Sequence, residues 1–211
     1  VNPAILIGNY FFDTIPQDLF RFNHGVWEEG LVTVKAPDNA GSNFYDDPFI
    51  LEKLQVEFTY QPINNQKKVN YTEMPAAHSI IDEYSAKLDG IPFTIPIGAL
   101  QCLHYFEQLT EGRMLVISGD QGYSTMEQLK HSGEPRLAIH GSFSMAVNYN
   151  AIARFFDKRN GKGFLTNHSD PLFQVFVGIL GGTAKDYPEL AMAHREHIEA
   201  FEPKDYWNLT T

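Results

Sequence analysis

Polar side chains that could bind a ligand or move a proton follow an apolar run near the start of the sequence. Residues 4–8 form this run, and Asn9, Asp13, Gln17 and Asp18 come after it, separated mainly by aromatic residues. An apolar run of this length, bounded by proline and polar residues, is typical of a strand buried on both faces of a parallel sheet. Because ligands of open α/β sheets bind beyond the carboxyl ends of such strands, the segment is a candidate site. Asp13 could instead cap a short helix.

A second polar turn follows another apolar run. Residues 113–118 predict a buried strand, and Asp120, Gln121 and Tyr123 come next in a glycine-containing turn. His140 ends a third short run and precedes glycine. We expect these side chains and those of the first segment to converge on one cleft at the carboxyl edge of the sheet.

Composition narrows the class of protein. The 211 residues carry a formal net charge of -10 and are 43% hydrophobic, as expected of an ordinary globular chain that does not attract nucleic acid. The single cysteine, Cys102, cannot form an internal disulfide, so we expect a reducing compartment such as the cytoplasm. Its position on an apolar helical face favours a buried thiol over a nucleophile. Neither a signal peptide nor an apolar segment long enough to span a bilayer is evident, so no membrane partner is expected.

The elements that must position the candidate residues alternate between strands and helices. Residues 19–22 and 26–34 predict a hairpin, and residues 54–60 alternate as a half-buried strand does. The block at about 20–63 therefore predicts an antiparallel insertion on a parallel framework. The remaining predicted elements are helices at 75–88, 98–111, 125–130, 148–159 and 186–201, and a closing pair of strands at 163–166 and 173–180. Asp186 is the expected cap of the last helix, with proline in its first turn.

The order of these motifs carries a family resemblance. Residues 9–16 read N-Y-F-F-D-T-I-P, residues 120–122 read D-Q-G, and residues 140–144 read H-G-S-F-S before Asn148 and Tyr149 open a helix. The arrangement resembles the MidA-like family of S-adenosylmethionine-dependent methyltransferases, which has N-E-F-F-D-A-L-P after its fourth strand and D-Y-G after its fifth. The resemblance spans most of residues 4–181, and Tyr10 stands where the family carries glutamate.

The resemblance implies a fold, a cofactor and an activity. The fold would be an α/β, Rossmann-like methyltransferase sheet, mostly parallel, with an antiparallel closing pair and the antiparallel insertion. The activity would be transfer of a methyl group from S-adenosylmethionine, with a protein side chain as the expected acceptor. The family's cofactor-binding glycine-rich loop lies on earlier strands and has no counterpart in this sequence, so we expect the chain alone to bind the cofactor poorly. The alternative is a non-catalytic protein-interaction module that keeps the fold.

Candidate roles follow from the residue types and the resemblance. Asn9, Asp13 and His140 are the catalytic candidates, and Asn9, Tyr10 and Phe12 are the cofactor-binding candidates. The candidates for substrate binding are Gln17, Asp18, Asp120, Gln121 and Tyr123. Phe12 could equally be a core residue. No metal site is expected, because His194 and His197, three residues apart, have no evident third ligand and better fit a solvated helix face.

The predicted domain organisation has two parts. Residues 1–185 would form a partial methyltransferase-like domain, equivalent to the carboxyl-side half of such a domain. Residues 186–211 would form a helical tail that leads into a further region of a longer parent, with large apolar side chains near its end that suit a partner surface.

Overall fold

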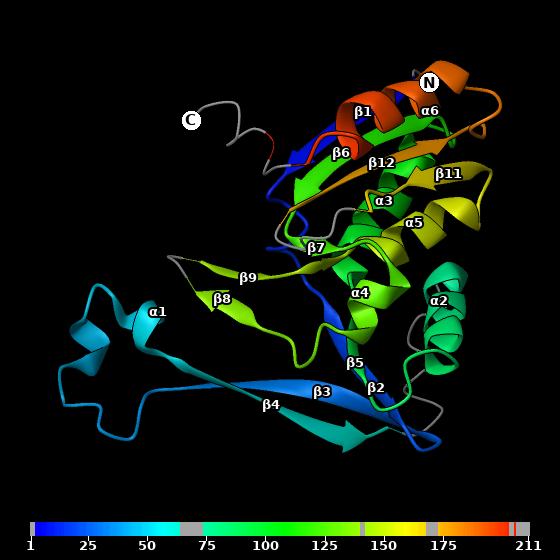
Figure 1. Cartoon of the computed structure of the whole chain (residues 1–211). Helices are drawn as coiled ribbons and strands as arrows, with labels where there is room; N and C mark the ends of the chain where they lie inside the picture. The colour runs from blue at the N-terminus through cyan, green and yellow to red at the C-terminus, as the bar shows by residue number, and fades with distance from the viewer. Residues whose placement is uncertain (1–2, 64–73, 140–141, 168–172, 203–204, 206–211) are drawn as a thin grey trace.

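The computed structural model describes residues 3–63, 74–139, 142–167, 173–202 and 205. A four-stranded mixed sheet carries the first candidate segment (Figure 1). Its strands, in spatial order, are β1 (Ala4–Asn9), β6 (Met114–Asp120), β12 (Gln174–Leu180) and β11 (Gly161–Phe164). β1 and β6 are parallel, whereas β12 is antiparallel to both of its neighbours. The predicted α/β class, the adjacency of the two apolar strands and the antiparallel closing pair are confirmed.

One detail of this sheet differs from the prediction. β1 was expected at the centre with both faces buried, but it lies at the edge of the sheet among the described residues, and Ile5 and Ile7 are 67% and 78% exposed. Alternate side chains of a strand point to opposite faces, and only the face that carries Leu6 packs against the core. The closing pair of β12 and β11 lies at the opposite edge of the sheet, as predicted, with β12 next to β6.

The predicted antiparallel insertion is confirmed and is larger than expected. Its four strands, in spatial order, are β4 (Gln55–Pro62), β3 (Val26–Lys35), β2 (Asp18–Asn23) and β5 (Pro92–Ile95). β5 has no counterpart among the predicted elements. The turn between β2 and β3 contains His24 and Gly25, both with positive φ, as a tight hairpin turn requires. β3 and β4 form a long ribbon that extends from the body to η1 (Phe44–Asp46) and α1 (Ile50–Lys53) (Figure 1).

α3 (Ile97–Leu109) and α5 (Tyr149–Asp157) lie on the inner face of the mixed sheet, and α2 (Pro75–Ser85) packs against α5 (Figure 1). α5 buries six of its nine residues, because an apolar stripe at helical spacing faces β11 and β12. The backbone leaves α3 through Gly112, whose φ of 72° is accessible to glycine at little cost. Cys102 of α3 is only partly buried.

Short elements connect the sheets beside the candidate site. They are β7 (Gly122–Tyr123), α4 (Met126–Lys130), β8 (Leu137–Ile139), β9 (Phe143–Met145) and β10 (Val147–Asn148). β7 pairs with β10 in parallel, so the turn after β6 is fixed against the start of α5. Thr125 caps α4, and Gln128 completes the capping box.

The last helix is shorter than predicted. α6 (Pro188–His194) lies on the opposite side of the mixed sheet from α3 and α5 (Figure 1), and a π-helical segment, Arg195–Glu199, follows it. Tyr187 is the residue at the cap position, not Asp186 as predicted. The Asp186 carboxylate instead accepts hydrogen bonds from the backbone N–H and hydroxyl of Thr183, at 2.7 and 2.9 Å, in the preceding turn. Within the described residues, the structure contains no helix with the length and apolar character needed to cross a lipid bilayer.

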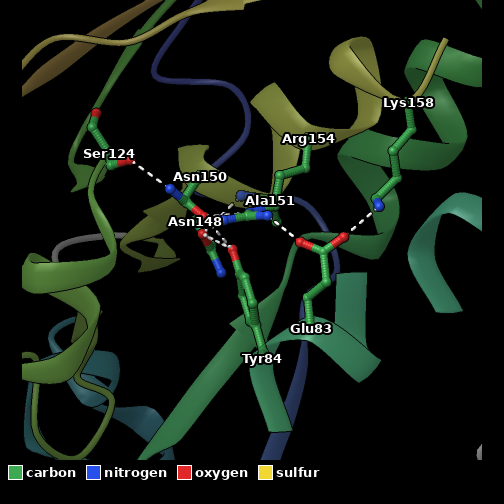
Figure 2. Close-up of polar contacts among 8 residues, drawn as sticks. All are labelled: Glu83, Tyr84, Ser124, Asn148, Asn150, Ala151, Arg154 and Lys158. Carbon is green, nitrogen blue, oxygen red and sulfur yellow. Dashed lines mark hydrogen bonds and ion pairs between the residues drawn. The ribbon is translucent and has the colours of Figure 1, made fainter. Parts of the chain in front are cut away.

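A buried polar network fixes α5 against α2 and β5 (Figure 2). The Asn148 side chain accepts a hydrogen bond from the Ala151 N–H at 3.0 Å and donates one to the Thr94 carbonyl at 2.8 Å. The Tyr84 hydroxyl lies 3.2 Å from the Asn148 Oδ1 and 2.9 Å from the Asn150 Oδ1. Asn148 and Tyr84 have no exposed surface, so this network replaces water for both side chains.

The same network ends in charges at the surface. The Arg154 Nε donates to the Asn150 Oδ1 at 2.8 Å, and its guanidinium pairs with Glu83. Glu83 also pairs with Lys158, so one carboxylate of α2 holds two cations of α5 (Figure 2). These cations lower the pKa of Glu83, with the hydrogen bond from Lys158 as the largest cause. The network therefore holds the helix that follows β10 in one orientation.

Candidate functional site

The carboxyl ends of β1 and β6 lie side by side. Asn9 is in register with Gly119, and the Tyr10 N–H donates a hydrogen bond to the Gly119 carbonyl at 2.9 Å. Tyr10 has a φ of 51°, so the chain turns sharply at the end of β1 and passes over the end of β6. Its exposed ring lies 5.8 Å from that of Phe173. A Cβ atom on Gly119 would lie 2.7 Å from the Phe173 ring and 3.0 Å from Asn9 Oδ1, so glycine is needed here.

The turn brings Asp13 to Asp120, 107 residues later in the sequence. The Asp13 N–H donates to the Asp120 Oδ2 at 3.2 Å, and the Gln121 N–H donates to Oδ1 of the same carboxyl at 3.1 Å. The Asp13 carbonyl accepts from the Met145 N–H at 2.9 Å, which joins the loop to β9. No helix forms at Asp13, so the helix-cap alternative is wrong. The predicted convergence of Asp13 and Asp120 is thus present in the structure.

The two carboxyl groups form a buried pair. Asp120 has no exposed surface and Asp13 is 9% exposed. Burial is the largest cause that raises the pKa of Asp120, to about 7, and the negative charge of Asp13 and a hydrogen bond between the carboxyl groups add to it. Among the described residues, Asp13 Oδ1 is buried without a donor. The Asp120 carboxyl, by contrast, accepts from two backbone N–H groups, those of Asp13 and Gln121.

A tyrosine beneath the pair was not among the sequence candidates. The Tyr149 hydroxyl lies 2.8 Å from the Ser118 hydroxyl, and its ring stacks on Phe176 at 5.8 Å between centroids. Burial and the charges of Asp120 and Asp13 raise the pKa of Tyr149, so it remains a neutral hydrogen-bonding group. The sequence predicts Tyr149 only as the start of a helix. The signal that could have identified it is a tyrosine, not a phenylalanine, on the buried face of that helix.

The other sequence candidates are distributed around this pair. Gln17 donates from Nε2 to the Met145 carbonyl at 2.9 Å, and its Oε1 is buried without a hydrogen-bond partner in the described structure. Asp18 opens β2 and pairs in register with Ile95 of β5. Phe12 is 4% exposed and belongs to the hydrophobic core, which was its alternative interpretation. Gln121 and Tyr123 line a neighbouring cavity. His140 lies outside the described residues.

The end of β1 exposes one amide and one aromatic ring. Asn9 offers an amide, and Tyr10 offers an exposed aromatic ring next to it. The described residues contain no group of three or more histidine, cysteine, aspartate or glutamate side chains that could hold a metal ion. His194 does not lie on a solvated helix face as predicted: it is 5% exposed, with its ring 5.5 Å from that of Phe164.

Comparisons with known proteins give one structural likeness. No family model matches the sequence. No curated protein matches it either. Among solved structures, the chain is similar to a COG1565 superfamily member from Burkholderia thailandensis, described as a "likely methyl transferase" bound to S-adenosyl-homocysteine, with 12% sequence identity and a TM-score of 0.48. The match covers 84% of this chain and 53% of the other, so this chain spans about half the length of that protein.

Proposed function

We propose that this chain is the acceptor-side part of an S-adenosylmethionine-dependent methyltransferase that acts on a protein side chain. The observation that carries the proposal is the buried pair of Asp13 and Asp120, at the joined carboxyl ends of two parallel strands. The sequence resemblance of the same loop to MidA-like methyltransferases supports it.

The residues of the pair fit a role in proton acceptance. When bound, S-adenosylmethionine supplies an electrophilic methyl group, and the acceptor atom loses a proton as it is methylated. A carboxyl whose pKa is about 7 accepts a proton at neutral pH and releases it again, which suits a general base. In this proposal Asp120 accepts the proton that the acceptor atom loses, and the N–H groups of Asp13 and Gln121 hold its carboxyl at the end of β6.

Asn9 and Tyr10 have a positioning role in this proposal. The amide of Asn9 and the ring of Tyr10 would hold the cofactor at the end of β1, on the same turn that carries Asp13. Correct placement of two reactants accounts for much of the rate enhancement in such transfers, since the protein has little covalent chemistry to perform. Because the sequence has no glycine-rich loop, the expected affinity is weak.

The test is a titration with S-adenosyl-homocysteine, followed by the backbone amide signals of the labelled chain in NMR. We expect the signals of Asn9 and Tyr10 to shift in fast exchange, and Asn9→Ala to weaken the binding about tenfold, equivalent to about 1.4 kcal/mol. Asn39→Ala, an exposed asparagine of the loop before η1, is the matched control and should leave the affinity unchanged. Shifts confined to other elements, or none at millimolar ligand, would overturn the proposal.

A specific observation favours a second candidate function, the non-catalytic interaction module. Large apolar side chains are exposed on β1 and on the ribbon that ends in η1 and α1. They are Ile5, Ile7, Leu31, Val32, Val34, Tyr45 and Phe49. Exposed apolar patches of this kind mark contact surfaces more often than isolated apolar residues do. If S-adenosyl-homocysteine leaves the Asn9 and Tyr10 signals unchanged, this function becomes the better supported one.

A further inference from the structure

A cavity of about 880 Å³ lies next to the carboxyl-edge site. Its walls come from β7, α4 and the hairpin of β8 and β9, which are neighbours in Figure 1. Gln121 and Tyr123 line it, and Gln121 directly follows Asp120 and donates its N–H to that carboxylate. The volume is within the range of cavities that bind small molecules or a protruding side chain, about 300–1,000 Å³.

Among the described residues, Arg136 of the cavity wall has no paired carboxylate. Arg136 lines the cavity, and no carboxylate of the described residues lies within 4.0 Å of its guanidinium. The acidic lining residue, Glu127, is already paired with Lys130 at 3.7 Å and with His131 at 3.5 Å. In a chain of net charge -10, an arginine with no carboxylate partner in the described structure is notable, and its planar fork suits a carboxylate or phosphate.

The rest of the wall combines apolar surface with hydroxyl groups, those of Tyr123, Thr125, Ser132 and Ser144. Tyr123 and Arg136 both line the cavity. Burial raises the pKa of Tyr123, and the positive charge of Arg136 opposes that rise. The phenol stays protonated at neutral pH and can donate a hydrogen bond to an anion. Leu137, Ala138 and Ala146 supply apolar surface to the same cavity.

We propose that this cavity binds an organic anion, a small apolar body that carries a carboxylate or a phosphate, with Arg136 paired to the anionic group and Tyr123 as a hydrogen-bond donor. The cavity shares Gln121 with the end of β6, so the bound anion is part of the molecule that receives the methyl group. That last assignment rests on the proposed function, whereas the binding of the anion does not.

The test is an NMR titration with four probes that share a phenyl ring: benzoate, phenyl phosphate, benzyl alcohol and benzylamine. We expect benzoate or phenyl phosphate to shift the amide signals of Tyr123, Leu137 and Ala138, and the better of the two identifies the anionic group. Benzyl alcohol and benzylamine should bind at least tenfold more weakly. Arg136→Gln should weaken binding of the anion at least tenfold, and Arg136→Lys should weaken it less, because lysine keeps the charge without the fork.

A matched control separates this arginine from general electrostatics. Arg195 is an exposed arginine of the π-helical segment after α6, and Arg195→Gln should leave the affinity for benzoate unchanged. Equal affinity for benzoate and benzyl alcohol, or an Arg136→Gln variant that binds as the original chain does, would overturn the inference. No cofactor is present in this experiment. If the chain binds benzoate but not S-adenosyl-homocysteine, the cavity site is supported and the methyltransferase function is rejected. If it binds S-adenosyl-homocysteine but not benzoate, only the cavity site is rejected.

Discussion

Asp120 occupies an environment that favours its protonated form more strongly than water does. It has no exposed surface and lies against a second carboxyl, and both conditions raise its pKa. The unfolded chain has an ordinary aspartate, with a pKa near 3.9. Folding therefore takes up a proton between about pH 4 and pH 7. The resulting contribution to stability is complete below pH 4 and is lost as the pH rises through about 7.

Asp120→Asn removes this titration and keeps the shape of the side chain. At each pH we compare the melting temperature of the variant with that of the original chain. We expect the variant to gain about 5 °C on the original chain between pH 5 and pH 8, equivalent to about 2 kcal/mol, because only the original chain loses the stabilising proton. Asp38→Asn, at an exposed position of the loop after β3, is the control and should show a constant difference. Differential scanning calorimetry at the two pH values measures both. A difference that does not change with pH would show that Asp120 is ionised throughout.

At the scale of elements, α5 depends on hydrogen bonds that the apolar stripe does not supply. Its first turn is capped by Asn148, which also reaches the backbone of β5, and Tyr84 of α2 contacts the same amide (Figure 2). The two amide oxygens near the Tyr84 hydroxyl each keep another donor, Ala151 N–H or Arg154 Nε. Loss of the hydroxyl is therefore less costly than loss of the asparagine.

Substitutions in this network should rank accordingly. We expect Tyr84→Phe to lower the free energy of unfolding by about 1 kcal/mol, since no acceptor is left without a donor. Asn148→Ala should lower it by about 3 kcal/mol, because the buried Thr94 carbonyl and the first turn of α5 lose their partners. Urea denaturation measures both changes. Equal losses for the two variants would mean that the network does not act through Asn148.

At the scale of the whole molecule, the mixed sheet is covered unequally. α3 and α5 pack on one face, where Leu103 is 1% exposed and belongs to the core. On the other face α6 covers part of the sheet, and Ile5 and Ile7 of β1 remain exposed. Apolar residues in the two places have the same chemistry and very different free energies of burial.

A pair of truncations measures this asymmetry. Ile7→Ala should change the free energy of unfolding by less than about 0.5 kcal/mol, as expected for an exposed position. Leu103→Ala should lower it by about 2–5 kcal/mol, because it removes buried surface and leaves a cavity. Chemical denaturation of dilute protein gives both values. A loss of several kcal/mol for Ile7→Ala would show that another molecule or copy covers β1 in solution.

The sequence by itself determined the elements whose signals are local. The apolar runs that became β1 and β6, the hairpin turn at His24 and Gly25, and the glycine after α3 depend on the intrinsic preferences of a few neighbouring residues. Local preferences also identified the antiparallel closing pair, since parallel neighbours need a long crossover connection and these two strands are joined by a short link. Local preferences do not decide the role of Asp186. Its carboxylate could cap the first turn of α6 or accept from Thr183 in the preceding turn, and only the contact with Thr183 forms.

Only the tertiary structure decided which faces are buried and which side chains meet. An isoleucine in β1 has the same local signal whether or not another element covers it, so the exposure of Ile7 depends on the packing of distant segments. The contact between Asp13 and Asp120 joins residues 107 positions apart, and the raised pKa of Asp120 arises from that contact and from burial together. Sequence placed both carboxylates at strand ends. The parallel register of β1 and β6 then brought those ends together.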